Sequence, residues 1–414
     1  MNLAWSSIAA LVIAVLLSCT TAINVGVLSL VMALIVGVYL GGMSVGAVLA
    51  GFPTPLFITL IGVTLLFAIA ECNGTLARVT GAAVRLCRGH AGILPIMFFV
   101  LGIVIATIGA GATPASALLA PPAMAVAGRA GIPALLMAIM AGNGALAGTL
   151  SPFAPTGIVA NGVMSRIGLA GYEWQTFAYN AFAHTFVGFT GFLVLGGWRL
   201  FKRRDTAVVQ AEDPDAGPMD QRHWLTVAGI VALILGVAGF EMDVGMTALI
   251  IAATLTLLRT VDESKAIQRM PWGVILMVTG VSVLIAMLEK TKGLELFATG
   301  LANISTPASV APIVAFGTGM VSVYSSTSGV VLPAFLPMVP HLAERLGNIE
   351  PLPIAWSMNI GASLVDLSSL STVGALFLAG AAPGTNTRAL FNGLLVWGMS
   401  MALVGAAVCW MLFG

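Results

Sequence analysis

Charged side chains are scarce in this sequence. Of its 414 residues only 8% are charged, 17 basic and 16 acidic, whereas 59% are hydrophobic. A soluble domain carries roughly 25% charged residues, so this chain cannot cover itself with a water-facing surface. The net charge of +1 gives no indication of a nucleic-acid partner. These shortages exclude a soluble protein and predict no nucleic-acid partner.

Cysteine and histidine are also few, and they form no familiar chemical motif. The four cysteines (Cys19, Cys72, Cys87, Cys409) have no paired spacing and no partner histidine, which argues against disulfides and zinc. The chain contains no HisGluXXHis, no paired aspartates and no Ser/His pair on facing apolar segments. We therefore expect neither an intramembrane enzyme nor an organic cofactor.

Long apolar runs are abundant instead. Membrane spans need about 20 mostly apolar residues, and the 48 glycines and 20 prolines indicate close packing and broken helices at membrane depth. The predicted spans are Ala4–Cys19, Val25–Leu40, Pro55–Ala70, Pro133–Val163, Thr176–Leu195, Trp224–Phe240, Val244–Leu258, Trp272–Leu288, Pro353–Ala379 and Leu390–Phe413.

Two further apolar segments are interrupted midway by small and hydroxyl residues. These segments, Leu94–Gly128 and Pro312–Pro340, are interpreted as re-entrant hairpins that enter and leave on one face. A polar linker at residues 199–223 separates the two halves of the chain. The predicted organisation is a first repeat at 1–198 and a second repeat at 224–414.

The two halves resemble each other in sequence. "VGVLSLVMALIVGVYL" at Val25 aligns with "VGMTALIIAATLTLLR" at Val244, and "IGVTLLFAIAE" ending at Glu71 aligns with "TGVSVLIAMLE" ending at Glu289. The second alignment pairs Gly62 with Gly280. Because each repeat has an odd number of spans, the second copy is expected to be inverted across the membrane, as in many transporters.

The distribution of basic residues predicts the orientation. With the linker in the cytoplasm, 13 of the 17 basic residues lie inside, and only Arg166, Lys290, Lys292 and Arg345 lie outside. This fits the positive-inside rule and places both termini outside a bacterial inner membrane. The first hairpin then opens on the cytoplasmic side and the second on the outer side.

Four interrupted segments carry the candidate chemistry, two in each repeat. The hairpins contain "IGAGATPASALLAPP" and "VSVYSSTSGVVLP", and the following spans contain "AGNGALAGTLSPFAPTG" and "GASLVDLSSLSTVG". Half-helix N-termini would attract a carboxylate, while unwound carbonyls and hydroxyls suit a hard cation such as Na⁺. No Lys or Arg lies in these segments, so a dianion would be neutralised by dipoles and co-bound cations. For one such stretch alone, a packing interface is the simpler interpretation.

The candidate site residues come from these four segments. An ionisable group at membrane depth marks a functional site, and Asp366 is the only carboxylate in a broken span. Asn143 is a candidate substrate ligand or an interhelical hydrogen-bond donor, whereas Glu71 and Glu289 are expected at the interfaces and His184 in packing. The predicted substrate ligands are Thr113, Pro114, Ser116, Asn143, Ser325, Ser326, Thr327 and Ser328. The predicted sodium ligands are Gly111, Ala112, Thr149, Ser151, Asp366, Ser368, Ser369 and Ser371.

This order of hairpins and broken spans resembles the divalent-anion/sodium symporters of the ion transporter superfamily. Their hairpin tips carry Ser-Asn-Thr, which Ser325–Thr327 resembles and Gly111–Thr113 matches only in part. "FITLIGVTLLFAIAECNGTL", "IGAGATPASALLAPPAM" and "GTLSPFAPTGIVANGV" are similar to the N-terminal half of malonate/dicarboxylate carriers of MatC type. The resemblance implies an all-α membrane fold of two inverted five-span repeats, an elevator mechanism and a homodimer. Because Gly111 and Ala112 lack hydroxyls, backbone ligation is expected there.

The expected function is import of a small dicarboxylate, malonate first, driven by Na⁺ or H⁺. Two alternatives within transport are a cation/proton antiporter and the membrane subunit of a binding-protein-dependent carboxylate carrier. An antiporter usually needs a dense carboxylate pair at its helix crossing, where this chain has only Asp366. The expected partners are the substrate, the lipid bilayer and a second copy of the chain.

Overall fold

The computed structural model describes residues 3–20, 23–78, 90–202, 218–240 and 242–414, and within these ranges it contains helices and no strands. The main helices of the first half are α1 (Leu3–Thr20), α2 (Val25–Leu34), α4 (Thr54–Cys72), α6 (Ile93–Ile105), α7 (Ala112–Ala130), α8 (Ala134–Ala147), α9 (Pro155–Arg166) and α10 (Glu173–Val194). Those of the second half are α11 (Gln221–Phe240), α12 (Val244–Leu257), α13 (Glu263–Arg269), α14 (Trp272–Lys290), α15 (Gly293–Asn303), α16 (Val310–Tyr324), α18 (Val339–Arg345), α19 (Pro351–Leu364), α20 (Thr372–Ala379) and α21 (Thr387–Phe413).

The chain is a multi-pass membrane protein. Among the described residues, five helical stretches are long and apolar enough to cross a membrane, namely Thr54–Cys72, Ile93–Ala110, Trp272–Lys290, Pro351–Ala379 and Thr387–Phe413. A sixth candidate is the bent pair Val310–Val323 and Thr327–Arg345. Each of the ten segments expected to span the membrane lies on helix, although several of these helices are shorter than 18 residues. Most of the linker at 199–223 falls outside the described residues.

Both segments expected to be hairpins contain a helix, a break and a second helix; that they enter and leave the membrane on one face stays a prediction. In the first, α6 continues through a π-helical turn, η2 (Ala106–Ala110), and the chain reverses at Gly111 into α7, which packs against α6. In the second, α16 ends at Tyr324 and a helix resumes at η5 (Thr327–Val331), bent by 120°. That helix continues through α17 (Leu332–Phe335) and η6 (Leu336–Met338) into α18.

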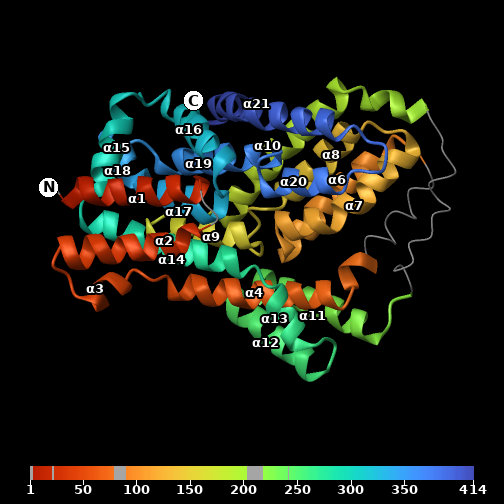
Figure 1. Ribbon diagram of the computed structural model, residues 1–414, viewed down its shortest axis with the longest axis horizontal. Coiled ribbons are helices and arrows are strands. Elements are labelled where there is room, and N and C mark those ends of the chain that lie inside the picture. Colours follow the sequence, from red (N-terminus) through yellow and green to blue (C-terminus); the bar gives the residue numbers. More distant parts are fainter. Residues whose placement is uncertain (1–2, 21–22, 79–89, 203–217, 241) are drawn as a thin grey trace.

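The spans after the hairpins are interrupted as expected. The predicted span at Pro133–Val163 divides into α8 and α9 with non-helical turns between them. Its counterpart divides into α19, a 3₁₀ turn at η7 (Val365–Leu367) and α20. Figure 1 shows these hairpins and broken spans on one side of the molecule, with α2, α4, α12 and α14 along the other.

Glycine contacts bring helices of the two halves together. A Cβ added at Gly62 of α4 would meet the backbone of Gly245 in α12, and a Cβ at Gly280 of α14 would meet the backbone of Gly26 in α2. The sequence alignment pairs Gly62 with Gly280 and Gly26 with Gly245, so the two contacts are reciprocal. Each half therefore supplies one helix to each crossing.

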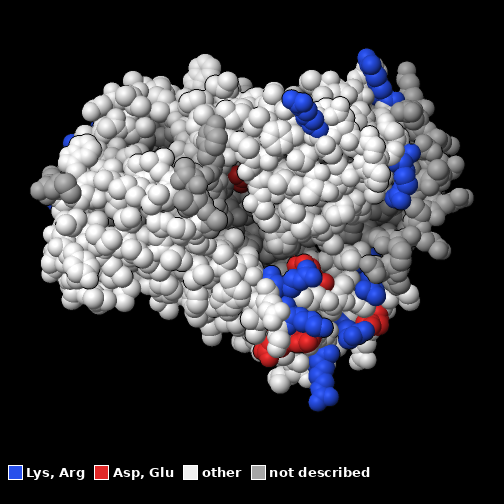
Figure 2. Space-filling view, viewed as in Figure 1, with Lys and Arg blue, Asp and Glu red and all other residues white. Residues whose placement is uncertain are grey.

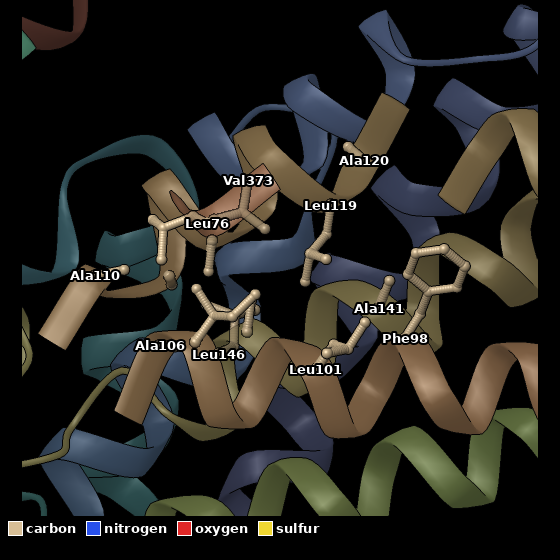
Figure 3. Close-up of a cluster of buried hydrophobic side chains, with 14 of the residues drawn as sticks. Leu76, Phe98, Leu101, Ala106, Ala110, Leu119, Ala120, Ala141, Leu146 and Val373 are labelled. Carbon is tan, nitrogen blue, oxygen red and sulfur yellow. The ribbon is translucent and has the colours of Figure 1, made fainter. Parts of the chain in front are cut away.

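The hairpins are packed tightly against the broken spans through small side chains. Figure 3 shows Phe98 and Leu101 of α6, Leu119 of α7 and Leu146 of α8 in one buried cluster. A Cβ at Gly144 of α8 would meet the α6 backbone at Phe99, so α6 and α8 approach closely. This packing fixes the hairpin tip relative to the helix break.

Basic residues collect at one end of the molecule. Figure 2 shows Lys and Arg gathered around α11–α13 and at the same end of the neighbouring helices, whereas most of the visible face is uncharged. Both marked chain ends lie in the opposite half of Figure 1. The inverted relation of the repeats and the membrane orientation stay predictions.

Candidate functional site

A cavity of about 280 Å³ lies where the two hairpin tips meet the two helix breaks. We call it the central cavity. Both hairpins and both broken spans contribute side chains to its wall. Its lining residues are Ala112, Thr113, Leu146, Thr149, Thr156, Val323, Ser325, Ser326, Thr327, Ser328, Asp366, Leu370, Ser371, Thr372 and Val373.

Two glycines shape the first hairpin tip. Gly109 has φ 129° and Gly111 has φ 79°, values that side-chain-bearing residues rarely adopt. A Cβ at Gly109 would also meet the ring of Phe67 on α4, and one at Gly111 would meet Pro155. The reversal lets α7 begin at Ala112, with the exposed Thr113 at the cavity wall.

The second hairpin tip is rich in hydroxyls that are partly used locally. The Ser326 hydroxyl oxygen accepts a 3.1 Å hydrogen bond from the Gly329 N–H and so caps the returning helix. The Ser325 hydroxyl donates to the Val321 carbonyl at 2.8 Å. Ser328 lines the cavity half-buried.

Asp366 is tied to the second hairpin tip. The Thr327 hydroxyl oxygen lies 2.7 Å from each carboxylate oxygen of Asp366, and the Ser322 hydroxyl lies 2.5 Å from that of Thr327. Ser322 also donates to Asp366 at 3.4 Å. The carboxylate thus connects the second helix break to the second hairpin tip, and it is the only ionisable side chain among the described residues that line the cavity.

The two helix breaks have matching internal contacts. In the first, a Cβ at Gly157 would meet the Ser151 carbonyl, and in the second a Cβ at Gly374 would meet the Ser368 carbonyl. The same spacing aligns Thr149 with Asp366, and both line the central cavity. The second half thus carries a carboxylate where the first half has a hydroxyl.

Side chains around the breaks satisfy backbone groups that the missing helical turns leave free. The Asn180 amide donates to the Leu146 and Ala147 carbonyls at 3.0 and 3.3 Å, at the end of α8. The Ser371 hydroxyl donates to the carbonyls of Asp366 and Ser368 and accepts from the Gly374 N–H. These hydrogen bonds stabilise the non-helical conformation of the two breaks by pairing backbone groups there.

The electrostatic character of the central cavity comes mainly from helix ends. The first residues of α7, η5, α9 and α20 are represented in its lining by Ala112, Thr327, Thr156 and Thr372. Each helix N-terminus carries unpaired N–H groups and about half a positive charge. No Lys or Arg is present among the described residues that line the cavity. The arrangement can hold an anion by backbone dipoles and hydroxyls.

The structure brings most predicted ligands together and leaves others outside the cavity. Predicted residues at its wall are Ala112, Thr113, Thr149, Ser325, Ser326, Thr327, Ser328, Asp366 and Ser371. Gly111 and Pro114 line an adjoining cavity of about 470 Å³, which we call the vestibule. Residues buried outside both cavities are Ser116, Asn143, Ser151, Ser368 and Ser369.

Two of the buried serines differ in their hydrogen bonding: Ser151 has a partner and Ser116 has none among the described residues. The Ser151 hydroxyl donates to the Thr107 carbonyl at 2.6 Å and so ties the first break to the first hairpin. The Ser116 hydroxyl is buried in α7 without a hydrogen-bond partner in the described part of the chain. The geometry therefore gives Ser151 a structural contact and Ser116 no place at the cavity wall.

Asn143 belongs to a buried hydrogen-bond network and not to the cavity wall. Its amide donates to the Ile139 carbonyl at 2.9 Å, and its oxygen lies 3.0 Å from His184 Nδ1. His184 Nε2 lies 3.3 Å from the Ser363 hydroxyl, which donates to Asn180 at 2.6 Å. The network joins α8, α10 and α19, so His184 connects the two broken spans.

Sequence reasoning missed Thr156, Thr372 and Ser322. Thr156 follows Pro155 at the first turn of α9, and Thr372 follows the cap Ser371 at the start of α20. Proline or a capping serine before a resumed helix is a signal that could have identified both. Ser322 lies within a regular helix, and nothing in its sequence context indicates the contact with Thr327.

Comparisons with known proteins concern the family and the fold. Residues 1–149 match the family model described as the N-terminus of the dicarboxylate carrier protein MatC. No curated protein matches the chain. Among solved structures, the chain is similar to the crystal structure of the YdaH transporter of Alcanivorax borkumensis, with a TM-score of 0.58 and 16% identity over 91% of this chain and 88% of that one. At this identity the likeness concerns the fold.

The family match falls on the part of the chain that contains the first hairpin, whose residues carried the resemblance noted in the sequence. The N-terminal region of the chain, residues 1–149, thus matches the model of the MatC family of dicarboxylate carriers, and the chain shares the fold of a solved membrane transporter.

Proposed function

We propose that the protein is a secondary carrier that imports a small dicarboxylate, malonate first, across a bacterial inner membrane. The observation that carries this proposal is the convergence of four helix N-termini on one hydroxyl-lined cavity, whose described lining residues include no Lys or Arg. Helix N-termini bind carboxylates through N–H groups and the helix dipole. The cavity volume of about 280 Å³ lies at the small end of ligand sites and suits a compact dianion.

The coupling ion is proposed to be Na⁺, with H⁺ as the alternative. A dianion that enters a site without basic side chains needs positive charge that binds with it. Among the described residues at the cavity, Asp366 supplies the only carboxylate, with hydroxyls and carbonyls nearby, and hard cations prefer such oxygen ligands. Because Asp366 bonds Thr327 at the second tip, a cation at this carboxylate would be linked to the tip that contacts the substrate.

Transport is proposed to follow an elevator mechanism, in which hairpins and broken spans move against a scaffold. Each tip meets the scaffold at a glycine: Gly109 lies against Phe67 of α4, and a Cβ at Gly329 would meet Met277 of α14. Contacts at glycines, which have no side chain to interlock, support a block that moves against the scaffold. The reciprocal crossings of α4 with α12 and of α14 with α2 support an inverted repeat. The scaffold is proposed to form the homodimer interface.

The direct test is uptake by purified protein in liposomes. A panel of malonate, C4-dicarboxylates, a tricarboxylate and monocarboxylates is offered with and without a Na⁺ gradient, and separately with a pH gradient. We expect saturable malonate or C4-dicarboxylate uptake that needs one of the two gradients. Transport of cations without any carboxylate would instead indicate an antiporter, and uptake only with an added binding protein would indicate a subunit of a larger carrier.

A further inference from the structure

The vestibule adjoins the central cavity and shares part of its wall. Thr113, Thr156 and Ser328 line both cavities. Beyond them the vestibule extends along α4 and the start of α14, between the scaffold and the first hairpin. A substrate that passes between the central cavity and this face of the membrane would therefore cross the vestibule.

One cationic side chain stands at the vestibule wall. Arg269, the last residue of α13, lines it together with Glu71, near the end of α4. Arg269 Nη1 lies 2.9 Å from Glu71 Oε1, and no Lys or other Arg is present among the described residues that line either cavity. The described walls of the two cavities thus offer an incoming anion a single full positive charge, and that charge is paired with a carboxylate.

The ion pair of Arg269 and Glu71 is too exposed to contribute much to the stability of the fold. The Arg269 side chain is 65% exposed and the Glu71 side chain 38% exposed. Exposed ion pairs contribute little to stability because water and salt screen them. The contact with Glu71 uses one guanidinium nitrogen, Nη1, whereas a guanidinium can bind a carboxylate through two parallel N–H groups.

We propose that Arg269 is a carboxylate-binding station at the mouth of the transport path, and that Glu71 occupies it when no substrate is present. A substrate carboxylate displaces Glu71 from the guanidinium, enters the vestibule, and then passes to the hairpin tips by way of Thr113 and Ser328. Because a substrate carboxylate takes the place of the Glu71 carboxylate, the positive charge on Arg269 stays compensated during the exchange. This inference rests on the proposed function and identifies where its substrate is first bound.

Kinetics from the two membrane faces test the station. In liposomes with one orientation of the protein, Arg269→Gln is expected to raise the KM for malonate roughly three- to tenfold from the vestibule face, with little change in Vmax. Glu71→Gln is expected to lower that KM, and the double variant to behave like Arg269→Gln. Arg129→Gln is the matched control, since Arg129 is an exposed arginine in the last turn of α7 and lines neither cavity.

A second measurement does not depend on transport. Ala117, which lines the vestibule, is replaced by cysteine in a chain whose native cysteines are serine, and labelling by anionic and cationic thiol reagents is compared. Arg269→Gln is expected to slow the anionic reagent relative to the cationic one severalfold, and malonate to slow labelling when Arg269 is present. An unchanged ratio of labelling rates, or an unchanged KM in a transporting protein, overturns the station. A lowered ratio in a protein that transports no carboxylate keeps the anion station and rejects the proposed substrate.

Discussion

The hydroxyl of Thr327 lies 2.7 Å from both carboxylate oxygens of Asp366, so the tip of the second hairpin is hydrogen-bonded to the break in the following span. A hydroxyl has one hydrogen, and it therefore donates to one oxygen at a time. Asp366 Oδ1 also accepts from Ser322, and the carboxylate lone pairs that neither hydroxyl uses can accept a cation or a proton. The two segments that the sequence indicated separately thus meet at one carboxylate.

Asp366→Asn tests the coupling ion. If Asp366 is a sodium ligand, the variant is expected to weaken apparent Na⁺ affinity about tenfold, and more than malonate affinity at saturating Na⁺. If it is a proton carrier, the variant loses the pH dependence of transport and retains any Na⁺ dependence. Uptake measured against Na⁺ and pH distinguishes the two. Unchanged dependence on both would make Asp366 a structural residue.

The hairpin tips are tested by bulky replacements. Thr113→Leu and Ser326→Leu place apolar side chains at the wall of the central cavity, where they remove a hydroxyl and fill space. We expect each variant to insert into the membrane and to lose uptake by more than tenfold. Thr254→Leu is the control, because Thr254 is exposed on α12 and its hydroxyl bonds only its own helix, at Ile250. Normal uptake by both tip variants would reject the assignment.

The buried network around His184 is expected to position the two broken spans. His184→Ala leaves the Asn143 oxygen and the Ser363 hydroxyl without this partner inside the protein. The Asn143 oxygen is then buried unpaired, which costs about 1–3 kcal/mol, whereas Ser363 still donates to Asn180. Thermal unfolding in detergent is expected to shift downward, whereas His341→Ala, in the short helix α18, serves as the control and leaves it near the wild-type value. Equal unfolding temperatures for the two variants would contradict the positioning role.

The reciprocal glycine crossings predict equal sensitivity at equivalent positions. Gly62→Ala and Gly280→Ala each bring a Cβ against backbone that cannot rotate away. We expect both to destabilise the protein by about 1–3 kcal/mol. Gly300→Ala in α15 is the control, because nothing lies within 4 Å of its Cβ; it gains helix propensity and is expected to be neutral or stabilising. A large loss at one crossing only would argue against the repeat.

Topology is tested independently of the site. The excess of basic residues on one face predicts a cytoplasmic reporter at residue 210 and periplasmic reporters at both termini. Residue 210 lies outside the described residues, so this prediction rests on charge alone. Cysteine accessibility that places the two termini on opposite faces would exclude two inverted five-span repeats.

The helices were predictable because apolar length is a strong signal, and the breaks because Gly, Ser and Thr interrupt it. The sequence did not predict which hydroxyls reach the central cavity. Thr149 lines it while Ser151, two residues later, turns to the Thr107 carbonyl, and no helical or strand period relates side chains within such a turn. The link between Glu71 and Arg269 joins residues 198 apart, which local patterns cannot show. His184 was correctly expected in packing, but its role between two spans depends on two partners, Asn143 and Ser363, from different helices.

The glycine crossings also bear on how the protein is made. Gly62 on α4 lies against α12, which begins at Val244, so α4 must reside in the membrane until about 180 further residues have been synthesised. Until then its closely packing face contacts lipid or the insertion machinery. Gly26 on α2 packs against α14, which is synthesised later than α12. Neither half can form these crossings alone, and their assembly is therefore a late event that follows insertion of α12 and α14.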